Sequence, residues 1–157
     1  VRQYAVDAAV ARLCYTYGPT VTPTNSRADA QFLRKALAGE DVVLKSAGSQ
    51  VRSYCYAADA AGALLTLLLS GASGDAYNVA NRGSVASIRE YAETLARLAG
   101  VRVTFDLPTD AERQGYSVVT RAVQRPDKLE ALGWRPRFSL EKGLKHTLKI
   151  LSGEALK

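Results

Sequence analysis

Strand-like and helix-like segments alternate along this 157-residue chain, and this alternation restricts its possible folds more than any other feature. Residues 9–16 (AVARLCYT) are a largely apolar run followed by the turn residues Gly18 and Pro19, which is typical of a buried strand. Further strands are expected over residues 41–45, 51–56, 76–80 and 102–107, and helices over residues 26–39, 59–70, 87–99, 126–132 and 139–151. The pattern predicts an α/β fold with short strands and about five helices.

Individual residues predict where the helices start and which side faces the core. Ser87 and Glu90 form a capping-box pattern at the start of helix 87–99. Ser26, with Asp29 three residues later, predicts the N-cap of the first helix. In the second helix, apolar side chains recur with the spacing i, i+3, i+4 and i+7. They are expected to form its core-facing stripe: Ala61, Leu64, Leu65 and Leu68.

Length and composition indicate one globular domain covering residues 1–157. Hydrophobic residues make up 47% and charged residues 23% of the chain, which excludes disordered, collagen-like and coiled-coil classes. No apolar run reaches the ~20 residues that a membrane-spanning helix needs. The N-terminus also lacks the layout of a signal peptide, so we expect a cytoplasmic protein with no membrane partner.

The formal net charge of +6 raises the alternative of a stand-alone basic module that binds a polyanion. The cationic residues are spread along the chain, however, and no run of Lys and Arg exceeds two residues. Basic and aromatic residues are not interleaved as in RNA-binding motifs. Nucleic acid is therefore not the expected partner.

Few residues of the chain could bind a metal or form a catalytic triad. Cys14 and Cys55 lie among apolar residues, which favours two reduced, buried thiols, with a disulfide between them as the alternative. Two cysteines cannot form a four-cysteine zinc site. His146 is the only histidine and is expected at the surface or at a helix end. Trp134 is expected to fill the core beside a G-W-x-P turn. We therefore predict no metal site.

The chain begins with residues 1–5 (VRQYA) and contains no methionine, which favours a piece of a longer protein. A parallel sheet that lacks its upstream strands would expose an unpaired edge. We therefore expect self-association, as a homodimer or as an oligomer with swapped elements. A self-associating module without catalytic activity is thus a further alternative for the isolated chain.

Four stretches occur in an order that is found in a known family. They are residues 12–19 (RLCYTYGP), 48–59 (GSQVRSYCYAAD), 76–81 (AYNVAN) and 128–136 (KLEALGWRP). Together they resemble the C-terminal half of the extended short-chain dehydrogenase/reductases, the NAD-dependent epimerase/dehydratase family that acts on nucleotide sugars. The resemblance extends from about residue 6 to residue 151. It implies the substrate-binding half of a Rossmann-type enzyme, with the last strands of the Rossmann sheet.

Two motifs of this family are missing from the chain. It contains no G-x-x-G-x-x-G loop for the dinucleotide and no Y-x-x-x-K pair, and Tyr4 is followed four residues later by Ala8 instead of Lys. The resemblance implies that the catalytic Tyr and Lys and most of the NAD site precede residue 1. No catalytic residue is therefore expected here, and the isolated chain is predicted to be inactive. The complete enzyme would oxidise a sugar hydroxyl transiently, permitting epimerisation, dehydration or decarboxylation.

Arginine suits a nucleotide-sugar diphosphate because its planar fork donates two charge-assisted hydrogen bonds. By resemblance, Arg52 occupies the arginine of a Q-x-R-x-[FYW] element that reaches the diphosphate or the sugar. Arg121 matches an arginine of relatives that contacts the nucleotide, and Arg27 matches an arginine of the nucleotide-sugar decarboxylases of this family. For all three, a solvent-exposed arginine without a ligand is the alternative. Asn78 ends a strand where α/β sheets place ligands, although a purely structural role, with hydrogen bonds to nearby backbone, is slightly favoured.

The turn formed by Gly18 and Pro19 would run beside the nicotinamide in relatives, since glycine permits a close backbone approach. An ordinary turn is the alternative. The chain also departs from the family pattern. Tyr15 stands where many relatives have an asparagine that contacts the substrate phosphate, and Gln124 and Arg125 stand where an acidic residue is usual. The remaining pattern most resembles the UDP-glucuronate decarboxylase and dTDP-glucose 4,6-dehydratase branches.

Overall fold

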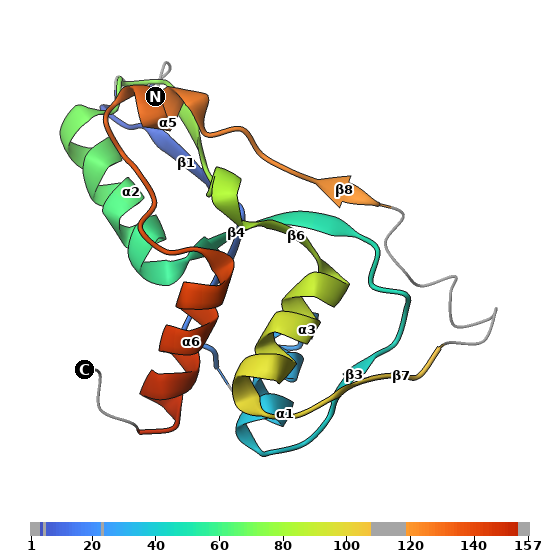
Figure 1. Ribbon diagram of the computed structural model, residues 1–157. Coiled ribbons are helices and arrows are strands. Elements are labelled where there is room, and N and C mark those ends of the chain that lie inside the picture. Colours follow the sequence, from blue (N-terminus) through green and yellow to red (C-terminus); the bar gives the residue numbers. More distant parts are fainter. Residues whose placement is uncertain (1–3, 5, 23, 108–118, 154–157) are drawn as a thin grey trace.

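The computed structural model describes residues 4, 6–22, 24–107 and 119–153 and has the predicted α/β architecture (Figure 1). Its strands are β1 (Val10–Leu13), β2 (Tyr15–Tyr17), β3 (Val42–Leu44), β4 (Val51–Tyr56), β5 (Ala76–Val79), β6 (Val85–Ser87), β7 (Val103–Phe105) and β8 (Arg121–Ala122). Its helices are α1 (Ala28–Leu37), α2 (Ala57–Ser70), α3 (Ile88–Ala99), α5 (Asp127–Ala131) and α6 (Leu140–Leu151), with a 3-10 turn over Arg82–Ser84. Among the described residues, none of these helices is long and apolar enough to cross a membrane.

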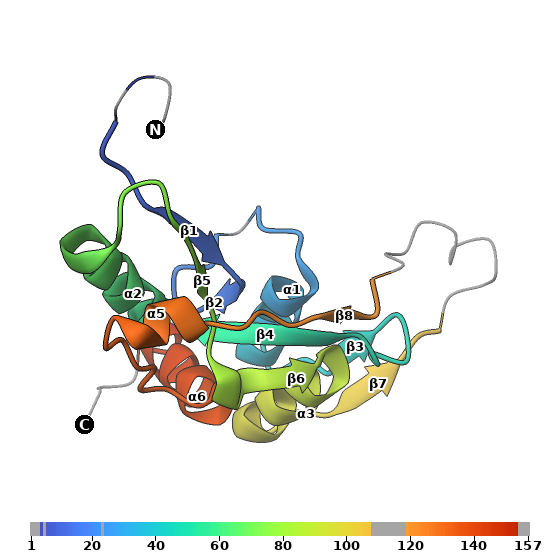
Figure 2. The same ribbon diagram turned by 90° about the horizontal axis from the view of Figure 1, so that it is seen from above.

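β4 is the central strand. It pairs in parallel with β2 through residues 54–56, and through residues 51–53 it pairs antiparallel with β6. β8 pairs in parallel with its first two residues. Two smaller parallel pairs, β1 with β5 and β3 with β7, complete the strands of the described residues. Figure 2 shows β4 and β8 side by side along the length of the molecule.

The apolar run over residues 9–16 is divided between two sheets, and its prediction as one strand is wrong. β1 ends at Leu13, and β2 begins at Tyr15. Between them the backbone N–H of Cys14 donates to the carbonyl oxygen of Val79 at 3.1 Å, the last contact with β5 before the chain moves to β4. This change of partner places Cys14 and Tyr15 between the two sheets.

Two apolar clusters form on the two faces of β4. Tyr54 and Tyr56 face a cluster built with α1, β3, α3 and α6, whereas Cys55 faces a cluster built with α2, β5 and α5. Alternation of side chains along a strand explains why neighbouring residues enter different clusters. In Figure 1 the helices that carry the first cluster, α1, α3 and α6, lie below β4, and those that carry the second, α2 and α5, lie toward the upper left.

The capping box of α3 is confirmed. The Ser87 hydroxyl accepts from the Glu90 N–H at 3.0 Å, and Glu90 Oε2 accepts from the Ser87 N–H at 2.6 Å. The predicted N-cap at Ser26 is wrong, because Arg27 occupies the N-cap of α1 without a capping side chain. The Arg27 N–H donates instead to Oδ1 of Asn25 at 3.1 Å.

The core-facing side of α2 is also not the predicted one. Ala60, Ala63 and Leu67 are buried, whereas the predicted stripe is exposed, with 81% of Leu68 accessible to solvent. The helix is apolar on nearly every side, so its sequence period does not distinguish one face from another. The structure places Ala60, Ala63 and Leu67 in the second cluster, together with Cys55 of β4.

Trp134 fills the second cluster as predicted. It is buried, and its indole N–H donates to the carbonyl oxygen of Asp59 at 3.2 Å. The carboxylate of Asp59 is buried as well and accepts from the backbone N–H groups of Arg137 and Phe138 at 2.9 and 3.0 Å. One residue at the start of α2 thus holds the segment that leads into α6.

Candidate functional site

Two of the predicted arginines converge on one tyrosine ring. Arg27 precedes α1, Arg52 is the second residue of β4, and Tyr15 opens β2. The guanidinium carbon of Arg27 lies 5.1 Å from the centre of the Tyr15 ring, and that of Arg52 lies 5.3 Å from it. Both distances allow cation–π interactions. The parallel register of β2 and β4, with Tyr15 opposite Tyr54, brings the ring beside Arg52.

Arg52 is almost fully buried, with 4% of its surface exposed. Both Nη1 and Nη2 donate to the carbonyl oxygen of Val119 at 3.2 Å, and Nη2 also donates to Oε1 of Gln50 at 2.6 Å. These acceptors are neutral, and none of the ion pairs among the described residues includes Arg52. Because buried charges are normally paired, this guanidinium is suited to an anionic ligand.

Arg27 differs from Arg52 in exposure and in partner. Its side chain is 44% exposed, and Nη2 lies 3.1 Å from Oδ2 of Asp29. A half-exposed ion pair of this kind contributes little to stability and can exchange its partner at low cost. Arg27 is therefore free to turn toward a ligand, whereas Arg52 is held in a fixed orientation.

A cavity of about 240 Å³ lies between these two arginines. Its walls include Tyr54, Tyr91, Phe32 and Ile88, in addition to Tyr15, Arg27, Asp29, Gln50 and Arg52. Burial, followed by the charge of Asp29, raises the pKa of the Tyr54 hydroxyl above its usual value. That hydroxyl is accordingly a neutral hydrogen-bonding group at physiological pH. The cavity combines aromatic walls with two cationic groups.

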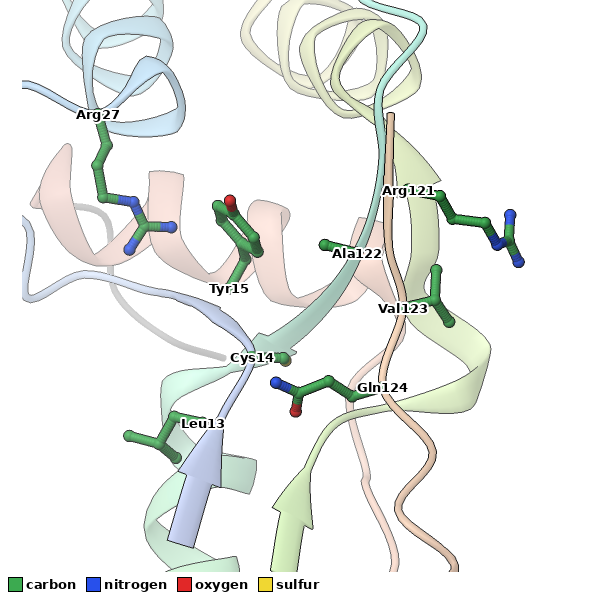
Figure 3. A pocket seen from close by; sticks show the side chains of 8 residues that line it. All are labelled: Leu13, Cys14, Tyr15, Arg27, Arg121, Ala122, Val123 and Gln124. Atoms are coloured by element: carbon green, nitrogen blue, oxygen red, sulfur yellow. The ribbon is translucent and has the colours of Figure 1, made fainter. Parts of the chain in front are cut away.

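A larger cavity of about 480 Å³ adjoins it and shares Tyr15 and Arg27 as common walls. Its other lining residues are Leu13, Cys14, Arg121, Ala122, Val123 and Gln124. Figure 3 shows the Arg27 guanidinium beside Tyr15, whereas the Arg121 guanidinium points away from both. The structure thus brings Arg27 and Arg52 together but does not direct Arg121 to the same place. A ligand role for Arg121 stays a prediction.

Asn78 is not among the described residues that line these two cavities. Its Nδ2 donates to the carbonyl oxygen of Arg125 at 3.0 Å, which ties β5 to the segment before α5. The neighbouring Asn81 is buried, and its amide bonds to Gly83, Ser84 and Phe138. These contacts favour structural roles, and binding by Asn78 remains a prediction.

Gly18 is required by close packing at the end of β2. A Cβ atom on Gly18 would lie 2.8 Å from the Cβ atom of Ala57, the first residue of α2. The missing side chain of Gly18 therefore permits the close approach of α2. Proximity of Gly18 and Pro19 to a nicotinamide stays a prediction.

Cys14 and Cys55 are free thiols, as predicted. Their mutual hydrogen bond lowers the pKa of Cys14, and the same bond together with burial raises the pKa of Cys55. Cys14 also lines the larger cavity, whereas Cys55 is fully buried. Cys14 is therefore the more reactive thiol at this site.

The prediction that His146 lies at the surface or at a helix end is wrong. His146 is half-buried in the middle of α6, and its Nδ1 lies 2.7 Å from the Tyr56 hydroxyl. Phe138 stacks near both rings. Sequence periodicity could not reveal this contact, because its partners are 90 residues apart. Among the described residues, no cluster of His, Cys, Asp and Glu could hold a metal ion.

The α/β fold thus places the guanidinium groups of Arg27 and Arg52 beside Tyr15 and next to two adjoining cavities. Comparison with known proteins gives the family. The model of the NAD dependent epimerase/dehydratase family matches residues 1–80, half of the chain, and the chain belongs to this family. The predicted resemblance is confirmed.

The curated relatives are longer than this chain. UDP-glucuronic acid decarboxylase 5 from Arabidopsis thaliana is 31% identical over 147 residues, which cover 91% of this chain and 40% of that protein. UDP-glucuronic acid decarboxylase 1 from Danio rerio is 29% identical and is covered to 36%. The chain thus spans 36–40% of the length of these two curated relatives.

Solved structures confirm the Rossmann-type fold class. UDP-glucose 4-epimerase from Thermus thermophilus, solved as a complex with NAD, has a TM-score of 0.80 and 29% identity, with 98% of this chain and 49% of that chain covered. UDP-glucose 4-epimerase from Thermotoga maritima, solved with UDP-glucose, has a TM-score of 0.79 and 26% identity, with 94% and 47% covered.

Proposed function

We propose that this chain forms the nucleotide-sugar-binding part of an NAD-dependent epimerase, dehydratase or decarboxylase, and that Arg27 and Arg52 hold the diphosphate. The observation that carries the proposal is the convergence of both guanidinium groups on Tyr15. Two cations at one place suit a group with about two negative charges, and an arginine fork matches phosphate oxygens.

The two arginines would contribute differently. Arg52 is buried and is oriented by Val119 and Gln50, so it would bind the diphosphate with little loss of side-chain freedom. Arg27 would give up its ion pair with Asp29 and bind a phosphate oxygen instead. The Asp29 carboxylate would remain nearby and would disfavour ligands with more negative charge than a diphosphate. A fixed cation and an adjustable cation together would define where the diphosphate lies.

The cavity walls support a nucleotide at this place. Tyr54, Tyr91 and Phe32 provide apolar and aromatic surface beside Arg52, and such surfaces accept a planar base. The larger cavity continues on the other side of Tyr15 and Arg27 and would receive the sugar. The names of the decarboxylase and epimerase relatives support a UDP-sugar as the substrate class.

The chemical step on the sugar is not assigned to residues of this chain. Neither a Tyr and Lys pair with the Y-x-x-x-K spacing nor a G-x-x-G-x-x-G motif occurs among its 157 residues. We propose that the residues described here bind and orient the substrate. Among epimerisation, dehydration and decarboxylation, similarity to the plant decarboxylases favours decarboxylation.

Titration calorimetry of the full-length protein tests this function directly. UDP and UDP-glucose should bind, and uridine should bind at least about 10-fold more weakly because it lacks the diphosphate. Equal affinity for uridine and UDP would contradict the proposal. Binding of RNA without any preference for nucleoside diphosphates would instead favour the basic polyanion-binding alternative.

A further inference from the structure

Gln124 is fixed at the wall of the larger cavity by a contact of its backbone. It follows β8, and its N–H donates to the hydroxyl of Ser53 in β4 at 3.0 Å. Ser53 is completely buried, so this bond joins the segment after β8 to the centre of the sheet. The Gln124 backbone is thereby anchored, and its side chain extends from a defined point.

Gln124 lines the larger cavity with its carboxamide. Figure 3 shows the amide nitrogen toward Cys14 and the amide oxygen on the side away from it, whereas the neighbouring Arg121 points outward. Its Oε1 is shielded from solvent and has no hydrogen-bond partner among the described residues. Buried side-chain oxygens nearly always have a partner, so an unpaired one at a cavity wall indicates a missing hydrogen-bond donor.

The surroundings limit what the missing group can be. Leu13, Ala122 and Val123 give the cavity apolar walls, and Gln124 adds a neutral group that can donate and accept. A sugar ring presents hydroxyl groups, which also donate and accept, on an otherwise weakly polar body. At about 480 Å³ the cavity has the size of a small-molecule site.

Arg27 links this cavity to the diphosphate. It lines both cavities together with Tyr15, so a diphosphate held at Arg27 would place its attached sugar in the larger cavity. We propose that Gln124 contacts that sugar, with its carboxamide hydrogen-bonded to a sugar hydroxyl. This inference rests on the proposed function and adds a residue that distinguishes the sugar from the nucleotide.

The test compares a nucleotide with its sugar derivatives in the full-length protein. Calorimetry gives the dissociation constants of UDP, UDP-glucose and UDP-glucuronic acid for the wild type and for Gln124→Met, which keeps the size of the side chain but removes its hydrogen bonds. We expect affinity for at least one UDP-sugar to fall about 3- to 10-fold, while affinity for UDP changes less than about 2-fold.

Glu93→Met is the control, because Glu93 is an exposed side chain of the same length as glutamine, lies on α3 and lines neither cavity. It should alter none of the three constants. Gln124→Asn withdraws the carboxamide by one methylene and should repeat the selective loss if Gln124→Met fails to fold. Unchanged constants, or an equal loss for UDP and both UDP-sugars, would overturn the role of Gln124 while leaving the proposed function intact. Failure of the wild type to bind any of the three would overturn both.

Discussion

Arg52 lies with its guanidinium carbon 5.3 Å from the centre of the Tyr15 ring, although the two residues belong to different strands. Arg27 approaches the same ring at 5.1 Å from a third element. By the resemblance to the family, Tyr15 stands where many relatives have asparagine. In this chain two guanidinium groups flank the aromatic ring at that position.

Substitution of Tyr15 tests whether its ring or its hydroxyl is used. Tyr15→Leu should weaken UDP binding several-fold, because each lost cation–π contact is worth about 0.5–1 kcal/mol and both guanidinium groups lose their support. Tyr15→Phe keeps the ring and should bind UDP almost as the wild type does. Equilibrium dialysis with labelled UDP measures both variants. If Tyr15→Phe lost as much affinity for UDP as Tyr15→Leu, the aromatic ring would not be the group that supports binding.

The two cysteines should react at very different rates. Under native conditions iodoacetamide should label Cys14, which lines the larger cavity and has a lowered pKa owing to its hydrogen bond with Cys55. Cys55 should react only after unfolding, because it is fully buried and its pKa is raised. Mass spectrometry of the peptides gives both rates, and Cys14→Ser is the control. Equal native labelling of the two thiols would refute this assignment.

Asp59 should be important for stability. Asp59→Ala leaves the backbone N–H groups of Arg137 and Phe138 without their acceptors, and we expect a loss of about 2–4 kcal/mol in the free energy of unfolding for the two bonds together. Asp75→Ala removes a half-exposed ion pair with Lys128 and should cost less than about 1 kcal/mol. Urea unfolding measures both values. Equal effects of the two substitutions would contradict the role assigned to Asp59.

The ion pair between Asp41 and Arg102 should make stability depend on pH at the acidic end. The backbone N–H and the guanidinium of Arg102 lower the pKa of Asp41, so the carboxylate stabilises the fold above its unfolded pKa of about 3.9. That contribution is lost as the pH falls through the lower, folded pKa. The difference in melting temperature between wild type and Asp41→Asn should therefore be constant near pH 7 and should shrink below about pH 4. A difference that grows as the pH falls would have the wrong sign.

Local signals in the sequence predicted the fold well. The order of strands and helices followed from periodicity and from turn residues, and the capping box of α3 followed from Ser87 and Glu90. Those features depend on residues within one turn of each other. β6 and β8 were missed because strands of three and two residues are too short to show a period.

Features set by tertiary contacts were not predictable in the same way. No turn residue marks the change of sheet at Cys14, and only the separate partners of β1 and β2 reveal it. For the site, family resemblance selected Arg27 and Arg52, and the structure places both beside Tyr15. The family resemblance could not predict the outward direction of Arg121 or the unpaired oxygen of Gln124, because both depend on the path of β8 and the residues after it.

The dissociation constant of UDP for Arg52→Ala, measured in the full-length protein by calorimetry, tests the central claim most directly. A charge-assisted bond to phosphate is worth about 1.5–3 kcal/mol, so the account predicts binding about 10- to 150-fold weaker than in the wild type. Arg52→Lys keeps the charge but lacks the planar guanidinium, so its affinity for UDP should lie between those of the wild type and Arg52→Ala. The control Arg89→Ala replaces an exposed arginine and should bind UDP as the wild type does. An Arg52→Ala protein that folds and binds UDP with unchanged affinity would contradict the account.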